Sequence, residues 1–194
     1  MGILNLSSQL NQNILGICLL IWVIVEYKVM VKQDKRPSKK DIKAIIFFSI
    51  LTVVFASISV FIFENRLGNI KTHLNLFFWI GILIIFIGIF IRQYSMYIMG
   101  SSYVATLQVQ EKPKLIKKGP FKVVRHPCYT GFMISLWGLA ISLLNWDFFV
   151  LTLFFSVSLF LVQISIEEKE LEKYFGNEYV EYKKKTKKLL PFIL

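Results

Sequence analysis

The chain alternates between long apolar runs and shorter polar segments. Because a bilayer core about 30 Å thick requires roughly 20 apolar helical residues per crossing, runs near that length predict membrane spans. Five such runs occur, at residues 14–31, 42–63, 74–91, 129–144 and 147–166. A gap of two residues separates the last two runs, so we expect these to form a tight helical hairpin. The pattern predicts an all-α integral membrane protein with about five transmembrane helices and a charged C-terminal helix.

Composition and charge support this interpretation. Hydrophobic residues make up 55% of the chain and the mean hydropathy is +0.58, which is too apolar for a soluble domain of this size. A net charge of +11 would suit a protein that binds nucleic acid, but the basic residues are concentrated in some of the segments between the apolar runs, as membrane topology requires. Residues 32–43 carry six of them, 92–125 carry seven and 167–194 carry seven, against two in 64–73. The positive-inside rule then places the N-terminus outside and the C-terminus in the cytosol, and we expect no nucleic-acid partner.

Other features of the chain exclude several classes of protein. Residues 1–13 carry no Lys or Arg and so lack the positive region of a cleavable signal peptide, and we expect the first span to be retained. Cys18 and Cys128 lie in a span and at a helix start, which implies no disulfide framework. The chain has neither Cys-x-x-Cys nor His-x-x-x-His spacing, so we expect no metal. The Lys- and Ile-rich composition without organelle signals favours a prokaryotic plasma membrane.

Two features stand out in residues 1–91, which otherwise read as spans and loops. Gly81 and Gly88 lie two helical turns apart, which favours close helix packing over a ligand site. Glu26 lies within the first apolar run, where an acid is a functional hypothesis by default. The alternative is that Glu26 snorkels or pairs locally near the cytosolic end of its span, beside Lys28, and its position favours this alternative.

Polar chemistry concentrates in residues 92–194, first in the stretch RHPCYTG. Pro127 suits the first turn of a helix, where its missing N–H is not needed and its φ is preset. The unpaired N–H groups of that turn and the positive end of the helix dipole form an anion site beside Arg125 and His126. The alternative, which stays open here, is that Arg125 and His126 only hold a span at the lipid headgroups.

A second group of polar residues lies in the stretch QISIEEKEL, at the end of the last run. Gln163 and Glu167 are four apart and share one helix face, while Glu168 is turned about 100° away. Because a hairpin brings the start of one span beside the end of the next, Arg125 and His126 should meet the two glutamates. That arrangement suits a zwitterionic ligand with amino and carboxylate groups. A structural salt bridge from Arg125 to a glutamate, weak at an exposed site, is the equal alternative.

These residues carry a resemblance to a known family. GPFKVVRHPCYTG, followed about 35 residues later by EEKELEKYFGNEYVEYKKKTKKLLPF, resembles the isoprenylcysteine carboxyl methyltransferase family, part of a wider group with phospholipid N-methyltransferases. The similarity covers residues 92–194, about half of the chain. It implies a membrane enzyme that transfers a methyl group from S-adenosylmethionine. Residues 92–194 would form the cofactor-binding core, with two transmembrane helices and a cytosolic tail, and residues 1–91 the N-terminal transmembrane helices.

The resemblance also implies roles for individual residues. The cofactor pocket would be lined by Gln110, Pro113, Lys114, Leu115, Ile116, Phe121, His126, Pro127, Cys128, Tyr129 and Glu167. Gln163 stands where family members commonly have an arginine assigned to the substrate or to the transition state, so a cation that could hold a substrate carboxylate is missing. Apart from the resemblance, the position of the residues makes Arg125 the candidate for positioning or charge stabilisation, and His126 at the helix start and Glu168 at the end of the last run the candidate bases.

The acceptor of the methyl group is the open question. The leading hypothesis is O-methylation of a carboxylate on a lipophilic or lipidated acceptor, which is already ionised and needs only alignment and exclusion of water. A phospholipid amine or a lipid phenol is the alternative, and it needs a proton removed. A third hypothesis is a non-catalytic membrane protein that retains the fold. The chain has no G-x-G-x-x-G after a strand pattern, which excludes a soluble Rossmann methyltransferase, and the oligomeric state stays open.

Overall fold

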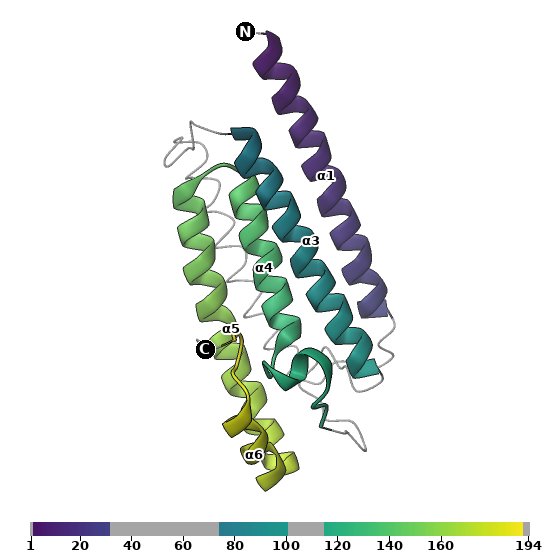
Figure 1. The fold of residues 1–194 in the computed structure, drawn as a ribbon, viewed down its shortest axis with the longest axis vertical. Coiled ribbons are helices and arrows are strands. Elements are labelled where there is room, and N and C mark those ends of the chain that lie inside the picture. The colour runs from purple at the N-terminus through teal and green to yellow at the C-terminus, as the bar shows by residue number, and fades with distance from the viewer. Residues whose placement is uncertain (1, 32–73, 101–114, 192–194) are drawn as a thin grey trace.

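The computed structural model describes residues 2–31, 74–100 and 115–191 (Figure 1). Its helices are α1 (Gly2–Val31), α3 (Leu74–Met99), the short 3-10 helix η2 (Gly119–Lys122), α4 (Pro127–Ser142), α5 (Trp146–Phe175) and α6 (Asn177–Lys185). Outside these helices, the described residues form one isolated parallel bridge, between Val124 and Lys187. The prediction of a mostly helical protein is confirmed.

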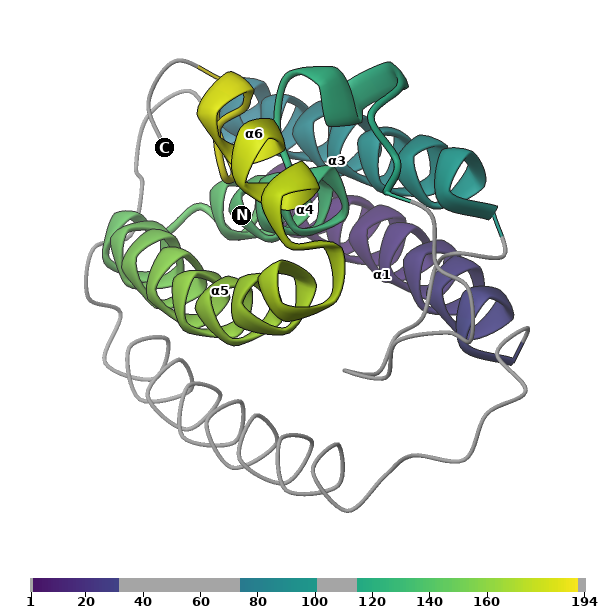
Figure 2. The same cartoon turned by 90° about the horizontal axis from the view of Figure 1, so that it is seen from below.

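Four helices run side by side along the long axis of the molecule, with α4 in the middle (Figures 1 and 2). α4 packs against α3 on one side and against α5 on the other, and α1 lies against α3. Figure 2 shows α6 at the end of the bundle where α4 begins and α5 ends. The polar residues predicted to meet therefore all lie at this one end.

α3 and α4 approach each other closely through glycine. A Cβ atom placed on Gly81 would lie 2.5 Å from the backbone nitrogen of Ser142, and one on Gly88 would lie 2.5 Å from the carbonyl oxygen of Gly131. Both distances are shorter than any real Cβ contact, so neither position can carry a side chain without moving a helix. The prediction that Gly81 and Gly88 mark close helix packing is confirmed.

Two helices are longer than the sequence predicts. α1 begins at Gly2 rather than at residue 14, and no proline interrupts it. α3 continues to Met99 rather than ending at residue 91. Arg92 does not end α3 because its side chain pairs with Glu26 of α1, so the helix keeps a charged residue without exposing it. The boundary of an apolar run is therefore not the boundary of the helix.

The predicted hairpin of the last two runs is confirmed. α4 and α5 are joined by a short turn in which Leu144 has φ 58° and the Asn145 side chain caps α5 by accepting from the backbone nitrogen of Phe148 at 2.8 Å. Within the hairpin, Trp137 Nε1 donates to Ser156 Oγ at 2.9 Å. These contacts hold the two helices antiparallel.

Two described helices, α3 and α5, are long and apolar enough to cross a membrane. α4 has 16 residues, about 24 Å of helix, which is shorter than a bilayer core about 30 Å thick. The apolar part of α1, Asn13–Glu26, is shorter still. The predicted span at 42–63 lies outside the described residues. The count of five transmembrane helices therefore stays a prediction.

The C-terminal segment folds back onto the start of α4. Gly176, with φ 56°, ends α5 and begins α6, and its nitrogen donates to Glu172 O at 2.8 Å. After α6 the tail runs beside residues 123–126, where Arg125 N donates to Lys187 O at 2.7 Å and Lys187 N donates to Val123 O at 3.2 Å. The break at Gly176 returns the tail to the predicted site.

The close contact of α3 and α4 predicts the effect of a single methyl group. A Cβ on Gly131 would lie 2.6 Å from the backbone atoms Arg92 N and Gly88 O, so we expect Gly131→Ala to lower the free energy of unfolding by about 1–3 kcal/mol. Gly16→Ala is the control, because nothing lies within 4 Å of its Cβ, and it should be neutral or stabilising. Thermal unfolding in detergent measures both. Equal stabilities of the two variants would contradict this packing.

Candidate functional site

The start of α4 has the predicted proline but not the predicted set of unpaired N–H groups, because Tyr129 N and Thr130 N both donate to His126 O, at 3.0 and 3.1 Å. Pro127 occupies the first turn of the helix and His126 precedes it. The tail covers this turn, because His126 N donates to Lys188 O at 3.1 Å and Thr130 Oγ1 donates to Leu189 O at 2.7 Å. The backbone of residues 126–130 is thus held by a segment about 60 residues away in the chain.

Arg125 and Glu168 form a buried ion pair. Arg125 Nε lies 2.7 Å from Glu168 Oε1, and each side chain is only 6% exposed. Arg125 Nη1 also donates to the carbonyl oxygens of Lys183, at 3.2 Å, and Thr186. The alternative of a structural salt bridge from Arg125 to a glutamate is therefore confirmed, but at a buried and not an exposed site, because the tail returns over it. One guanidinium group therefore joins the start of α4, the end of α5 and the segment at the end of α6.

The imidazole of His126 lies between two carboxylates. Nε2 is 3.3 Å from Glu168 Oε1 and Nδ1 is 3.8 Å from Glu167 Oε2. On its other side the ring stacks on Tyr129, with centroids 5.8 Å apart. The prediction that Arg125 and His126 meet Glu167 and Glu168 is confirmed. Nε2 of His126 lies within hydrogen-bond distance of Glu168 Oε1, whereas Nδ1, at 3.8 Å from Glu167 Oε2, does not.

Besides Thr152 Oγ1, two buried side-chain oxygens of α5 lack hydrogen-bond partners among the described residues, and both lie towards the end of the helix. They are Gln163 Oε1 and Glu167 Oε2, which lie one helical turn apart. A buried acceptor without a partner costs about 1–3 kcal/mol, a cost that a ligand with N–H or O–H donors would remove. Glu167 remains one-third exposed, so such a ligand can reach it from solvent. The oxygens of Gln163 and Glu167 together form a surface that can bind a ligand with hydrogen-bond donors.

Tyr179 on α6 is a residue of this region that the sequence did not single out. Its side chain is 1% exposed, and its hydroxyl has no hydrogen-bond partner among the described residues. Burial raises its pKa, so the hydroxyl stays protonated at neutral pH. Tyr182, one turn on, donates to Phe121 O at 2.7 Å, and burial raises its pKa to about 12. The only sequence signal was two tyrosines three residues apart on a charged helix.

Three of the remaining predicted cofactor residues form one cluster. Ile116, Phe121 and Cys128 gather in an apolar cluster with Met96 of α3. Leu115 is partly buried and is not part of this cluster. Gln110, Pro113 and Lys114 lie outside the described residues. The structure thus brings together the polar residues of the prediction and places the apolar ones on the α3 side of the α4 start.

Glu26 has a local partner and a distant one. Trp22 Nε1, one helical turn away, donates to Glu26 Oε1 at 3.4 Å, so local pairing occurs, although the side chain of Lys28 lies outside the described residues. The carboxylate also pairs with the guanidinium of Arg92 on α3, 66 positions along the chain, with Nε to Oε1 at 2.5 Å and Nη2 to Oε2 at 2.8 Å, so it points into the bundle and does not snorkel. The sequence signals for the pair of Glu26 and Arg92 were an acidic residue near the end of one apolar run and a basic residue directly after another.

The buried pair predicts a non-additive effect on stability. Arg125→Leu removes the nearest cation of the buried Glu168 carboxylate and leaves only His126 and Lys183, at 3.3 and 3.6 Å, so we expect it to lower the free energy of unfolding by about 3–5 kcal/mol. The double variant Arg125→Leu with Glu168→Leu should lose less than the two single variants together. Lys117→Ala is the control, because its pair with Glu178 is exposed and should contribute at most about 1 kcal/mol. Denaturant unfolding measures all four proteins, and strict additivity would contradict a coupled pair.

Comparison with known proteins bears on this geometry. The family model described as phospholipid methyltransferase matches residues 76–178, which include α3, α4, α5 and the polar site. The protein-S-isoprenylcysteine O-methyltransferase of Saccharomyces cerevisiae is 33% identical over 116 residues, covering 59% of this chain and 48% of that protein. The methanethiol S-methyltransferase of Pseudomonas deceptionensis is 29% identical over 130 residues, covering 66% of this chain and 48% of that protein.

A solved structure shares the fold. It is that of the eukaryotic intramembrane Ras methyltransferase, isoprenylcysteine carboxyl methyltransferase, with a TM-score of 0.59 and 24% sequence identity. The match covers 75% of this chain and 52% of that protein. At this identity the likeness concerns the fold. The chain spans about half the length of the relatives it matches.

Proposed function

The chain belongs to the phospholipid methyltransferase family, and on that premise we propose that it transfers the methyl group of S-adenosylmethionine to the carboxylate of a lipophilic acceptor. The observation that carries this proposal is the unpartnered oxygen of Glu167 beside His126 at the start of α4. The similarity to a protein-S-isoprenylcysteine O-methyltransferase supports a carboxylate on a prenylated acceptor.

The residues at the α4 start fit S-adenosylmethionine. When bound, this cofactor supplies a methyl group activated on a sulfonium sulfur, and it also carries an ammonium and a carboxylate group. Glu167 Oε2, buried and without a partner among the described residues, can accept a hydrogen bond from the ammonium. The positive end of the α4 helix dipole favours a carboxylate nearby.

The state of the candidate bases favours an acceptor that needs no base. The oxygens of Glu168 face Arg125, His126 and Lys183, at 2.7, 3.3 and 3.6 Å. Nε2 of His126 faces Glu168, so the two candidate bases contact each other and nearby charges instead of standing free for an acceptor. A carboxylate is ionised at neutral pH and requires only alignment with the methyl group and exclusion of water. In this proposal Arg125 and Glu168 are positioning residues that hold His126 and the tail.

A second candidate acceptor is a phospholipid amine, and Gln163 favours it. The amide oxygen of Gln163 is buried and lacks a partner among the described residues, so it complements a group that donates hydrogen bonds. Gln163 also stands where a family arginine would hold a carboxylate. The relative named for methanethiol methylation supports a family in which the acceptor varies.

The proposal places the site at the cytosolic face of a membrane. The end of the bundle that carries α6 also carries exposed lysines that include Lys184, Lys185 and Lys187. Basic residues near membrane helices face the cytosol, so we place the C-terminus there and the N-terminus outside. A lipophilic acceptor would then enter from the bilayer between helices, and the charged cofactor would enter from water. We assign the prokaryotic plasma membrane on composition.

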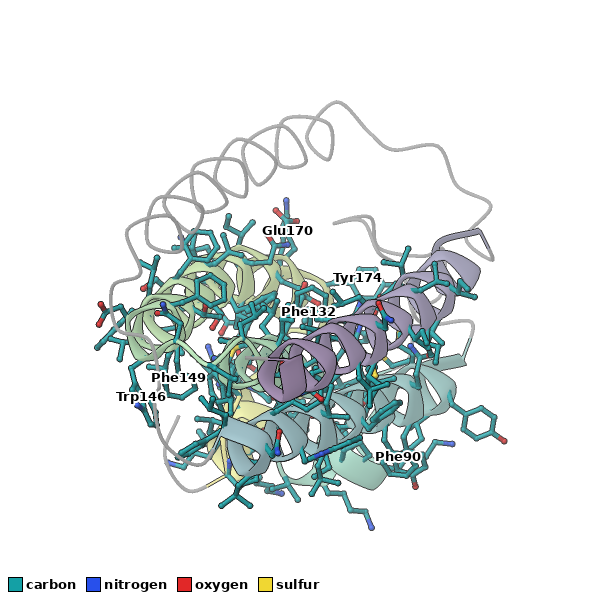
Figure 3. All side chains as sticks on the ribbon, turned by 90° about the horizontal axis from the view of Figure 1, so that it is seen from above. Phe90, Phe132, Trp146, Phe149, Glu170 and Tyr174 are labelled. Atoms are coloured by element: carbon teal, nitrogen blue, oxygen red, sulfur yellow. The ribbon has the colours of Figure 1, made fainter. Side chains whose placement is uncertain are left out.

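Cofactor binding tests the proposal first. We expect Glu167→Gln to weaken binding of S-adenosylmethionine about tenfold, because the ammonium loses a charged acceptor. Glu170→Gln, an exposed carboxylate on the same helix (Figure 3), is the matched control and should bind as the wild type does. Equilibrium binding to the detergent-solubilised protein measures both. A wild type that does not bind would overturn the proposal in favour of a non-catalytic protein.

The acceptor is tested by the chemistry of the product. Membranes that contain the protein and methyl-labelled S-adenosylmethionine should yield a base-labile product, as a methyl ester is. We expect Gln163→Arg to raise kcat/KM for a prenylcysteine carboxylate severalfold, because it adds a cation beside Glu167. Label that appears only in base-stable lipid would establish the amine acceptor and contradict the carboxylate.

A further inference from the structure

The N-terminal helix α1 lies outside the residues that match the family model. It nevertheless contacts α3, which packs against α4, the helix whose start carries the site. Contact is made through the carboxylate of Glu26, which accepts from Arg92 Nε at 2.5 Å and from Nη2 at 2.8 Å. The two side chains are 15% and 12% exposed, respectively. This is a bidentate pair inside an otherwise apolar bundle.

Aromatic side chains enclose the pair. The guanidinium carbon of Arg92 lies 5.1 Å from the ring centroid of Phe132, and Trp22 Nε1 donates to Glu26 Oε1 at 3.4 Å. The rings of Trp22 and Phe132 are 5.4 Å apart. Figure 3 shows Phe132 between α1 and α5. Stacking on Phe132 and the hydrogen bond from Trp22 leave the pair little freedom to rotate.

The third nitrogen of the Arg92 guanidinium, Nη1, points at the start of α4. Arg92 Nη1 donates to the carbonyl oxygen of Cys128 at 3.2 Å. Cys128 lies in the first turn of α4, two residues after His126, and its thiol contacts Met99 Sδ at 3.9 Å. Glu26 therefore occupies two nitrogens of Arg92, and the first turn of α4 occupies the third.

A role in stability alone does not explain this arrangement. A buried ion pair is weak evidence for stability, since apolar residues of similar volume often replace one without loss. The specific property of this pair is geometric, because a guanidinium held at Nε and Nη2 presents Nη1 in a fixed direction. The residue that receives Nη1 belongs to the proposed cofactor pocket.

We propose that Glu26 and Arg92 are positioning residues of the cofactor pocket, with Glu26 orienting Arg92 and Arg92 holding the Cys128 carbonyl and the first turn of α4. This inference rests on the proposed function. It adds α1 to the methyltransferase core, because a residue of α1 then determines how His126 and Tyr129 are placed. The cofactor is not expected to contact either charge.

Two variants separate positioning from simple pairing. Arg92→Lys keeps a positive charge opposite Glu26, but one ammonium cannot reproduce the bidentate pair and the bond to Cys128 together. We expect its dissociation constant for S-adenosylmethionine to rise about tenfold. The exchange variant, Glu26→Arg with Arg92→Glu, restores an ion pair but leaves no donor at position 92 for the Cys128 carbonyl. Its unfolding temperature should lie nearer the wild type than that of Arg92→Glu alone, while cofactor binding stays weak.

Glu178→Gln is the control for loss of an ion pair, because the exposed pair of Glu178 with Lys117 lies away from Arg92, and its binding should be unchanged. Recovery of both stability and cofactor binding in the exchange variant would overturn the inference, since any ion pair would then suffice. Wild-type binding by Arg92→Lys would overturn it too.

Should the exchange variant not fold, Trp22→Phe provides the test. It removes the hydrogen bond to Glu26 while keeping an aromatic ring beside Phe132, and it should weaken cofactor binding about two- to threefold; unchanged binding would overturn the inference. The two proposals fail differently. A wild type that does not bind S-adenosylmethionine overturns the proposed function and this inference with it, whereas a binding wild type with unaffected variants overturns this inference alone.

Discussion

The buried pair of Arg125 and Glu168 determines how the site is assembled. It lies where the start of α4, the end of α5 and the segment after α6 meet, and Arg125 also donates to carbonyl oxygens of that last segment. Because either charge alone would be costly in this buried position, the three segments are stable only when they come together. His126 takes its orientation from the same carboxylate, at 3.3 Å. The geometry of the candidate site thus follows from one interaction.

The bundle positions that pair by close contact of its helices. Gly81 and Gly88 let α3 approach α4 until backbone atoms nearly touch. This close packing fixes where the start of α4 lies relative to α3. A second ion pair, between Glu26 and Arg92, joins α1 to the same end of the bundle. Apolar helices therefore supply the scaffold, and two ion pairs align the end at which a water-borne cofactor and a lipophilic acceptor would meet.

Much of this arrangement was predictable from local sequence. Apolar runs predict helices, and a gap of two residues between runs predicts the hairpin, which in turn places Arg125 and His126 beside Glu167 and Glu168. The remainder depends on contacts between distant residues. The burial of Arg125 requires the tail to return at Lys187, and the partner of Glu26 lies 66 positions away, so neither is visible in a local pattern. Residues assigned by resemblance alone, such as Gln163, keep predicted roles, because their chemistry depends on ligands.

The central claim, that S-adenosylmethionine binds between the start of α4 and the end of α5, is tested most directly by photo-crosslinking. Radiolabelled cofactor irradiated on the solubilised protein, followed by proteolysis and mass spectrometry, locates the bound molecule. Our account predicts label in peptides that contain residues 126–129 or 163–168, and loss of that label when unlabelled cofactor competes. Competable label confined to other parts of the chain would contradict it.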